Sequence, residues 1–121
     1  SLNDFDNIDR VVGISGSKLS QADEEMLDRL AMSVNSRYCR HGCVECAGAC
    51  PLEVPVSRIM RYAYYFGVQG REKHAMSRYA KLGGSKASVC QDCSAPCDGA
   101  CPHGFQIRSQ LSKVHSMLTL A

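Results

Sequence analysis

Eight cysteines in two short windows restrict what this chain can fold around more than any other feature of its sequence. Four of them lie in Cys39–Cys50 and four in Cys90–Cys101, and the rest of the 121 residues contain none. A secreted domain held together by disulfides spreads its cysteines so that they close loops of different lengths. Two dense groups of four are instead typical of ligand sets, which implies reduced thiols and predicts a cytoplasmic protein.

The spacing within each window would allow the thiols to converge. Window one reads C-x3-C-x2-C-x3-C-P, and window two reads C-x2-C-x3-C-x3-C-P. Thiolates three or four residues apart fall on one side of a helical turn or tight loop. Thiolate sulfur prefers zinc, Cu(I) and iron–sulfur clusters to hard cations. The candidate metal ligands are therefore all eight cysteines: Cys39, Cys43, Cys46, Cys50, Cys90, Cys93, Cys97 and Cys101.

A proline after the last cysteine of each window favours iron–sulfur clusters among these metals. Cys50 and Cys101 each precede a proline, which pushes the residue before it out of the helical region and redirects the chain. In bacterial ferredoxins, a Cys-Pro of this kind supplies the fourth ligand to the other cluster of a pair. We therefore predict two 4Fe–4S clusters as cofactors.

Two other uses of the eight thiols stay open. Zinc sites made of four cysteines are common, although they usually consist of two separated C-x2-C pairs and not one dense run. A zinc protein of this kind would be a structural interaction module without redox activity. Four disulfides would require cysteines three and four residues apart to bridge distant partners.

Apolar residues recur at helical spacing along much of the chain, and no run of alternating residues indicates a sheet. We predict five helices, at about 3–15, 20–34, 55–66, 72–82 and 105–120. Asn3 with Asp6 resembles a capping pair for the first helix, and Ser20 with Asp23 for the second. Residues 11–14 also fit a short strand. We expect each apolar stripe to be helix-packing core, so the predicted fold class is all-α.

Charge is distributed unevenly, although the formal net charge is only +2. Residues 1–30 carry seven acidic side chains against three basic ones, and residues 57–86 carry seven basic against one acidic. Two solvated helix faces of opposite sign explain this pattern. A second interpretation is that the basic segment faces an anionic cofactor or partner. Nothing in the pattern resembles nucleic-acid readout, and no apolar stretch is long enough for a membrane anchor.

The residues around the cysteines resemble a known group of domains. The stretch Cys90–Cys97, running on to Cys101-Pro102, looks like an α-helical ferredoxin. Tyr38-Cys39-Arg40 and the cysteines that follow it resemble the C-terminal extension of one branch of the aldo-keto reductases. In that branch a ferredoxin-like domain follows a (β/α)8 barrel. The resemblance implies that residues 1–19 match the last helix of such a barrel and that residues 20–121 form a helical bundle around two clusters.

The resemblance also implies a function and a limit to it. It points to an electron-transfer domain of an oxidoreductase, whose redox partner would be a reductase barrel or a flavoprotein. The catalytic side chains of an aldo-keto reductase lie on its barrel, so we expect no catalytic site in this chain. Tyr64, Tyr65, Lys73 and His74 are accordingly assigned to helix surface or packing.

The assignment of each thiol to one of the two clusters has two possible answers. In the crossed arrangement, Cys39, Cys43 and Cys46 join Cys101, while Cys90, Cys93 and Cys97 join Cys50. In the uncrossed arrangement, each window holds its own cluster. We favour the crossed arrangement because the sequence C-x-G-A-C-P, shared by both windows, would place them side by side. One extra residue in each window, relative to the usual ferredoxin spacing of x2, x2, x3, leaves the loop geometry open.

Residues near the cysteines are weaker candidates. His41 lies in window one and His103 follows the second Cys-Pro. Either histidine could donate to cluster sulfur, although a solvated loop histidine is the simpler interpretation. Tyr38 and Phe105 would shield a cluster from water or pack in the core. The glycines of the two windows would let backbone N–H groups approach sulfur or make ordinary turns.

Overall fold

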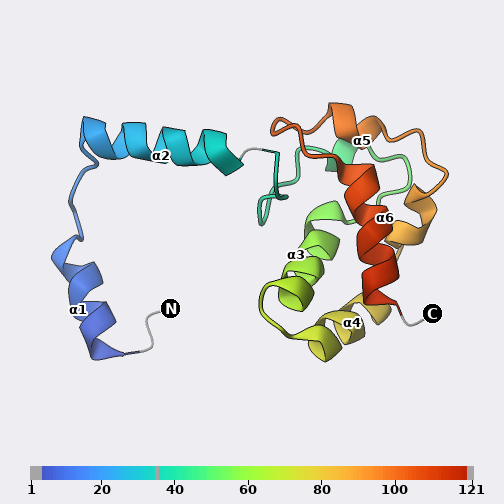
Figure 1. Ribbon diagram of the computed structural model, residues 1–121, viewed down its shortest axis with the longest axis horizontal. Coiled ribbons are helices and arrows are strands. Elements are labelled where there is room, and N and C mark those ends of the chain that lie inside the picture. Colours follow the sequence, from blue (N-terminus) through green and yellow to red (C-terminus); the bar gives the residue numbers. More distant parts are fainter. Residues whose placement is uncertain (1–3, 35, 120–121) are drawn as a thin grey trace. The chain divides into compact units, whose positions relative to one another are not determined.

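The computed structural model describes residues 4–34 and 36–119, and every regular element in these ranges is helical (Figure 1). The predicted all-α class is therefore confirmed. The chain divides into two units, Ser1–Ser33 and Val34–Ala121, which are described separately. No helix in the described ranges combines the length and the apolar character needed to cross a membrane.

The first unit consists of α1 (Phe5–Gly13) and most of α2 (Gln21–Val34). Helix α2 begins as predicted: the Ser20 hydroxyl donates to the Asp23 carboxylate at 2.6 Å, and the Asp23 backbone N–H donates back to that hydroxyl at 3.2 Å. The predicted cap of α1 is wrong. Asn3 lies outside the described residues, and the cap is Asp4, whose carboxylate accepts from the backbone N–H of Asn7 at 2.8 Å.

The apolar stripes of α1 and α2 are exposed, contrary to the prediction that they form core. Neither helix contains a buried residue, and Phe5 and Met26 are 83% and 61% exposed. A helix buries its apolar stripe only where another element packs against that stripe. The periodicity was therefore a correct guide to helix but not to burial. The alternative of a strand at 11–14 is wrong, because α1 continues to Gly13.

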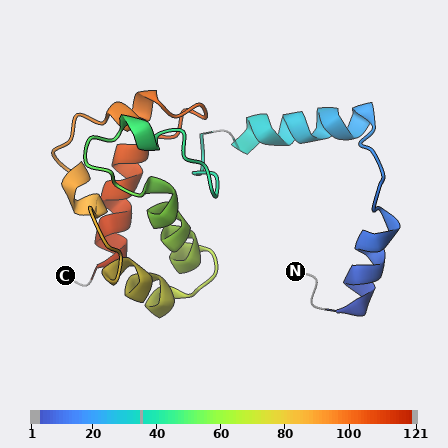
Figure 2. The ribbon, with the colours of Figure 1, turned by 180° about the vertical axis from the view of Figure 1, so that it is seen from behind.

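The second unit contains three longer helices, α3 (Val56–Gly67), α4 (Glu72–Ala80) and α6 (Ile107–Leu118). Helix α3 packs against both α4 and α6, as Figures 1 and 2 show from opposite sides. These helices confirm the three predicted between 55 and 120, with ends that differ by one or two residues. Three short turns were not predicted: η1 (Ala47–Ala49), η2 (Ala87–Cys90) and α5 (Pro96–Gly99).

The hydrophobic core of the second unit extends to the cysteine windows. The predicted stripe of α6 is buried along its whole length, from Ile107 to Leu118. Ile59 of α3 and Tyr79 of α4 are almost completely buried against it. Full burial of one such side chain contributes about 1.5–3 kcal/mol to folding. Three of the cysteines belong to the same buried cluster, Cys46, Cys90 and Cys97. Cysteines of both windows therefore pack into one hydrophobic core.

Candidate metal centre

The eight cysteines line two separate pockets, with four thiols in each. The first cysteine pocket is lined by Cys39, Cys43, Cys46 and Cys101, and the second by Cys50, Cys90, Cys93 and Cys97. All eight are free thiols. Each pocket thus takes three cysteines from one window and the Cys-Pro cysteine from the other. This is the grouping of the crossed arrangement, while metal ligation by these thiols stays a prediction.

The two Cys-Pro ends adopt the same local structure, so the sequence repeat is also a structural repeat. The backbone N–H of Glu53 donates to the carbonyl of Cys50, and that of Gly104 donates to the carbonyl of Cys101, both at 3.2 Å. Glu53 and Gly104 both have positive φ, at 49° and 63°. Helices α3 and α6 each begin six residues after the cysteine. As the proline requires, Cys50 is extended (φ −89°, ψ 108°).

A left-handed residue accommodates the extra residue of each window. In window one, Gly42 has a φ of +78°, and the Cys43 N–H closes a turn to the carbonyl of Arg40 at 3.2 Å. The Gly42 N–H donates to the Ser57 hydroxyl at 3.2 Å, which ties this turn to α3. In window two, Ala95 is left-handed (φ 60°, ψ 48°). These turns explain how a longer spacing still brings the thiols to one pocket.

Backbone N–H groups approach two of the sulfurs in the second cysteine pocket. The Val54 N–H donates to Cys50 Sγ, and the Ala95 N–H donates to Cys93 Sγ, each at 3.4 Å. Neither donor is a glycine, so these contacts do not come from the residues that the sequence suggested. N–H donation to sulfur stabilises the thiolate form, which is the form that binds metal.

Electrostatics in the pockets oppose four unbound thiolates. Burial, together with the neighbouring cysteines of its own pocket, raises the pKa of Cys39 to about 11. Burial also raises the pKa of Cys97 to about 11, helped by the Asp98 carboxylate and nearby cysteines, and it raises the pKa values of Cys46 and Cys90. Like charges in a partly desolvated space disfavour ionisation. A cationic centre bound by the sulfurs would remove this penalty, so the donor set fits a thiolate-ligated metal.

Arg108 connects α6 to the second cysteine window, a role that no sequence motif predicted. Its Nε donates to the carbonyl of Cys90 at 3.1 Å, and a terminal nitrogen donates to the carbonyl of Gln91 at 2.6 Å. Its backbone N–H donates to the Asp98 carboxylate at 3.0 Å. Arg108 also lines the second cysteine pocket, and its charge lowers the pKa of Cys90 against the raising effect of burial.

A second connection links α4 and α6 to the same window. The buried Tyr79 hydroxyl accepts from the Ala87 N–H at 3.0 Å and lies 2.8 Å from Nδ1 of His115. Because the hydroxyl hydrogen is free to point at His115, Nδ1 can act as the acceptor there. Ala87 begins η2, and η2 ends at Cys90. Tyr79 therefore fixes the start of η2, the turn whose last residue is Cys90.

The weaker sequence candidates are divided between the pockets and the surface. Tyr38, His103 and Phe105 line the first cysteine pocket, but His41 lines neither cysteine pocket. The guanidinium side chains that line the cysteine pockets belong to Arg40 and Arg108. Both lie outside the basic segment 57–86, so this segment does not line the pockets.

Three of the four residues assigned to surface or packing, Tyr64, Tyr65 and His74, form an aromatic cluster on α3 and α4 that lines neither cysteine pocket. The Tyr65 ring meets His74 edge-on, with 5.6 Å between ring centres, and tilts against Tyr64 at 6.4 Å. Arg61 lies 4.9 Å from the centre of the Tyr65 ring. A hydrogen bond from Arg61 lowers the pKa of the Tyr65 hydroxyl. Lys73 is exposed on α4.

Within the described residues, no three histidine, cysteine, aspartate or glutamate side chains form a group that could hold a metal ion. The case for a metal therefore depends on the donor set, which consists of four sulfurs in each of two pockets. Comparisons of the chain with known protein families, curated proteins and solved structures find no match.

Proposed function

We propose that this chain is an electron-transfer domain that binds two 4Fe–4S clusters, one in each cysteine pocket. The observation that supports the proposal most is the division of eight free thiols into two sets of four, each completed by the Cys-Pro cysteine of the other window. A Cys-Pro ligand shared in this way is a feature of two-cluster ferredoxins. Each bound cluster would take up and release one electron.

The surrounding residues would hold the clusters and limit their contact with water. Phe105 and Ile107 are buried in the wall of the first cysteine pocket, and Val54 and Leu111 are buried in the wall of the second. Burial and N–H donation to sulfur are two of the factors that set the potential of an iron–sulfur centre. Arg108 adds a positive charge beside the second pocket.

The wider context of the proposal is an aldo-keto reductase type of oxidoreductase in the cytoplasm. Its support is the sequence resemblance around Tyr38-Cys39-Arg40 and at the two Cys-Pro ends. The chain would exchange electrons with a reductase barrel or a flavoprotein and would have no catalytic site of its own. The alternative function is a structural zinc module, which the same four-sulfur sets would also suit.

Metal and sulfide analysis of anaerobically prepared protein tests the proposal. Two clusters correspond to about eight iron and eight acid-labile sulfide per chain, and a zinc module corresponds to about two zinc and no sulfide. Electron paramagnetic resonance after dithionite reduction then shows whether the metal accepts electrons. Zinc without sulfide, or iron that dithionite does not reduce, would contradict the electron-transfer function.

Paired substitutions test the crossed grouping with a matched control. Cys39→Ala with Cys101→Ala removes two ligands from the first cysteine pocket only, so iron should fall from about eight to about four per chain. Cys39→Ala with Cys50→Ala removes one ligand from each pocket and should impair both clusters. In the uncrossed arrangement the two results would be exchanged.

A further inference from the structure

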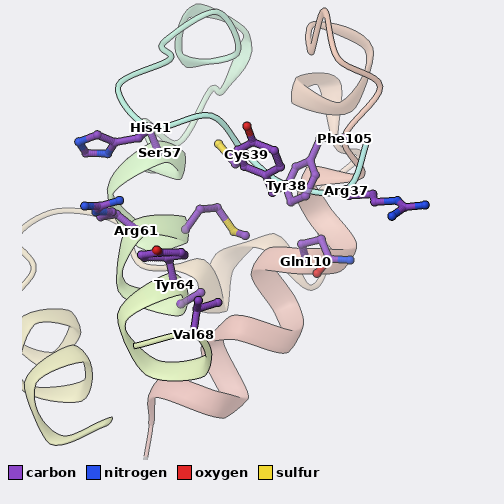
Figure 3. A pocket seen from close by; sticks show the side chains of 12 residues that line it. Arg37, Tyr38, Cys39, His41, Ser57, Arg61, Tyr64, Val68, Phe105 and Gln110 are labelled. Carbon is purple, nitrogen blue, oxygen red and sulfur yellow. The ribbon is translucent and has the colours of Figure 1, made fainter. Parts of the chain in front are cut away.

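A third cavity adjoins the first cysteine pocket and is not used by the proposed function. It lies between α3 and α6 beneath the segment 37–41, as Figure 3 shows, and its volume is about 410 Å³. Sites for small organic molecules commonly have volumes of about 300–1,000 Å³. The size of this cavity falls within that range.

The walls of the cavity favour a flat, aromatic ligand. Tyr64 comes from α3 and Val68 follows its last residue. Phe105 precedes α6, Gln110 lies in its first turn, and Tyr38 closes one end of the cavity (Figure 3). Aromatic side chains bind planar rings through stacked or edge-on contacts. Gln110 lies on the wall opposite α3, and its side-chain amide can donate to an oxygen atom of a ligand.

The charge of the lining favours an anion. Arg61 lines the cavity, and no aspartate or glutamate is among the described residues around it. The Arg61 guanidinium carbon lies 5.1 Å from the centre of the Tyr64 ring, so the cation and an aromatic face are presented together. The Arg61 Nε is buried and has no hydrogen-bond partner within the described part of the chain. Another part of the same side chain hydrogen-bonds to Tyr65, and the positive charge of the guanidinium favours an anionic group beside it.

We propose that this cavity binds a small planar aromatic anion, such as an aromatic carboxylate, against the wall that it shares with the first cysteine pocket. Tyr38, Cys39 and Phe105 line both spaces. The ligand would stack between the aromatic side chains and place its charged group toward Arg61. This site goes beyond the proposed function, because electron transfer by the two clusters does not require a ligand in this cavity.

The shared wall couples the two sites if the proposed function is correct. An anion in the cavity that Cys39 lines adds negative charge near a centre that gains negative charge on reduction. The cluster in the first pocket would therefore become harder to reduce when the ligand binds, and the more distant second cluster would change less.

The test compares 2-naphthoate with 2-naphthamide, which share a ring system and differ in charge. Isothermal titration calorimetry on the metal-loaded chain should give a Kd of about 1 mM or lower for 2-naphthoate. Because a charge-assisted hydrogen bond is stronger than a neutral one, 2-naphthoate should bind about tenfold more tightly than 2-naphthamide. Arg61→Gln should remove this preference while leaving the binding of 2-naphthamide within about twofold.

A second variant tests the location. Ala63→Phe places a ring into the cavity and should weaken both ligands by at least about tenfold. Ala80→Phe, at an exposed position of α4 outside the cavity, is the matched control and should bind as the parent does. Circular dichroism and metal content show whether each variant has folded. If Ala63→Phe has not folded, the result for Arg61→Gln tests the site by itself.

Two results would overturn the inference: no saturable binding of 2-naphthoate, or binding that Arg61→Gln and Ala63→Phe leave unchanged. The outcomes separate this inference from the proposed function. A zinc-containing protein that still binds 2-naphthoate with the Arg61 dependence would keep the site and reject electron transfer. An iron-loaded protein that does not bind 2-naphthoate would do the reverse.

Discussion

Replacing Arg108 tests whether α6 holds the second cysteine window through the two carbonyl contacts. Arg108→Gln removes the bond to Cys90, which is partly buried, and the bond to Gln91, which is exposed. A hydrogen bond with a charged partner contributes about 1.5–3 kcal/mol, and the exposed bond is given the lower range of about 0.5–1 kcal/mol. The expected loss in the free energy of unfolding is therefore about 2–4 kcal/mol.

The assay is urea unfolding of the metal-loaded chain under anaerobic conditions, with refolding checked for reversibility. With a slope of about 2 kcal/mol per molar urea, a loss of this size lowers the midpoint by about 1–2 M. Lys113→Gln, which removes an exposed charge from the same helix, is the control and should leave the midpoint nearly unchanged.

The same variant makes a local prediction about metal content. Because Arg108 contacts the second window and not the first, the second pocket should lose its metal first, so iron should fall toward about four per chain. Arg108→Lys keeps the charge but not the two-pronged donor and should fall between parent and glutamine variant. An unchanged urea midpoint, or equal loss from both pockets, would refute the reasoning.

Three further predictions follow from the loops and the core. Ala95→Gly removes the strain of a left-handed alanine, which offsets the entropy cost of glycine, so the urea midpoint of this variant should equal or exceed that of the parent. The control Ala100→Gly, at a φ of −86°, should lower the free energy of unfolding by about 0.5–1 kcal/mol. Tyr79→Phe leaves the buried N–H at the start of η2 without its acceptor and should cost about 1–3 kcal/mol in the same assay; an unchanged midpoint would contradict this role. In the metal-free chain, the pKa values of Cys39 and Cys97 are raised from 9.0 to about 11, so these thiols ionise in the unfolded chain at a lower pH than in the folded one. The melting temperature should therefore fall as the pH rises from about 9 toward 11. A melting temperature that rises over this range would contradict the argument.

Helical periodicity predicted the elements well and their burial less well. The stripe on α6 is buried as expected, because α3 and η2 pack against it. The equally regular stripes of α1 and α2 are exposed. Periodicity reports the face that a helix would bury, whereas burial also requires a partner for that face. No local pattern in a sequence specifies that partner.

The candidate site shows the same division. Cysteine spacing and the Cys-Pro ends, which are local features, led to the prediction of eight ligands, and the repeat favoured the crossed grouping over the uncrossed one. The importance of Arg108 and of the Tyr79–His115 pair could not be predicted in this way. Arg108 reaches carbonyl groups 17 and 18 residues away, and Tyr79 meets a histidine 36 residues away.

By itself, the sequence determined the helical class, the thiol inventory and the turns that its prolines and glycines require. These properties depend on backbone conformation and side-chain spacing over a few residues. Only the tertiary structure decided which four thiols share a pocket, which arginine supports the second window, and that a cavity adjoins the first. Those features arise where α3, α6 and the two windows meet, and contacts between distant segments depend on how the whole unit packs.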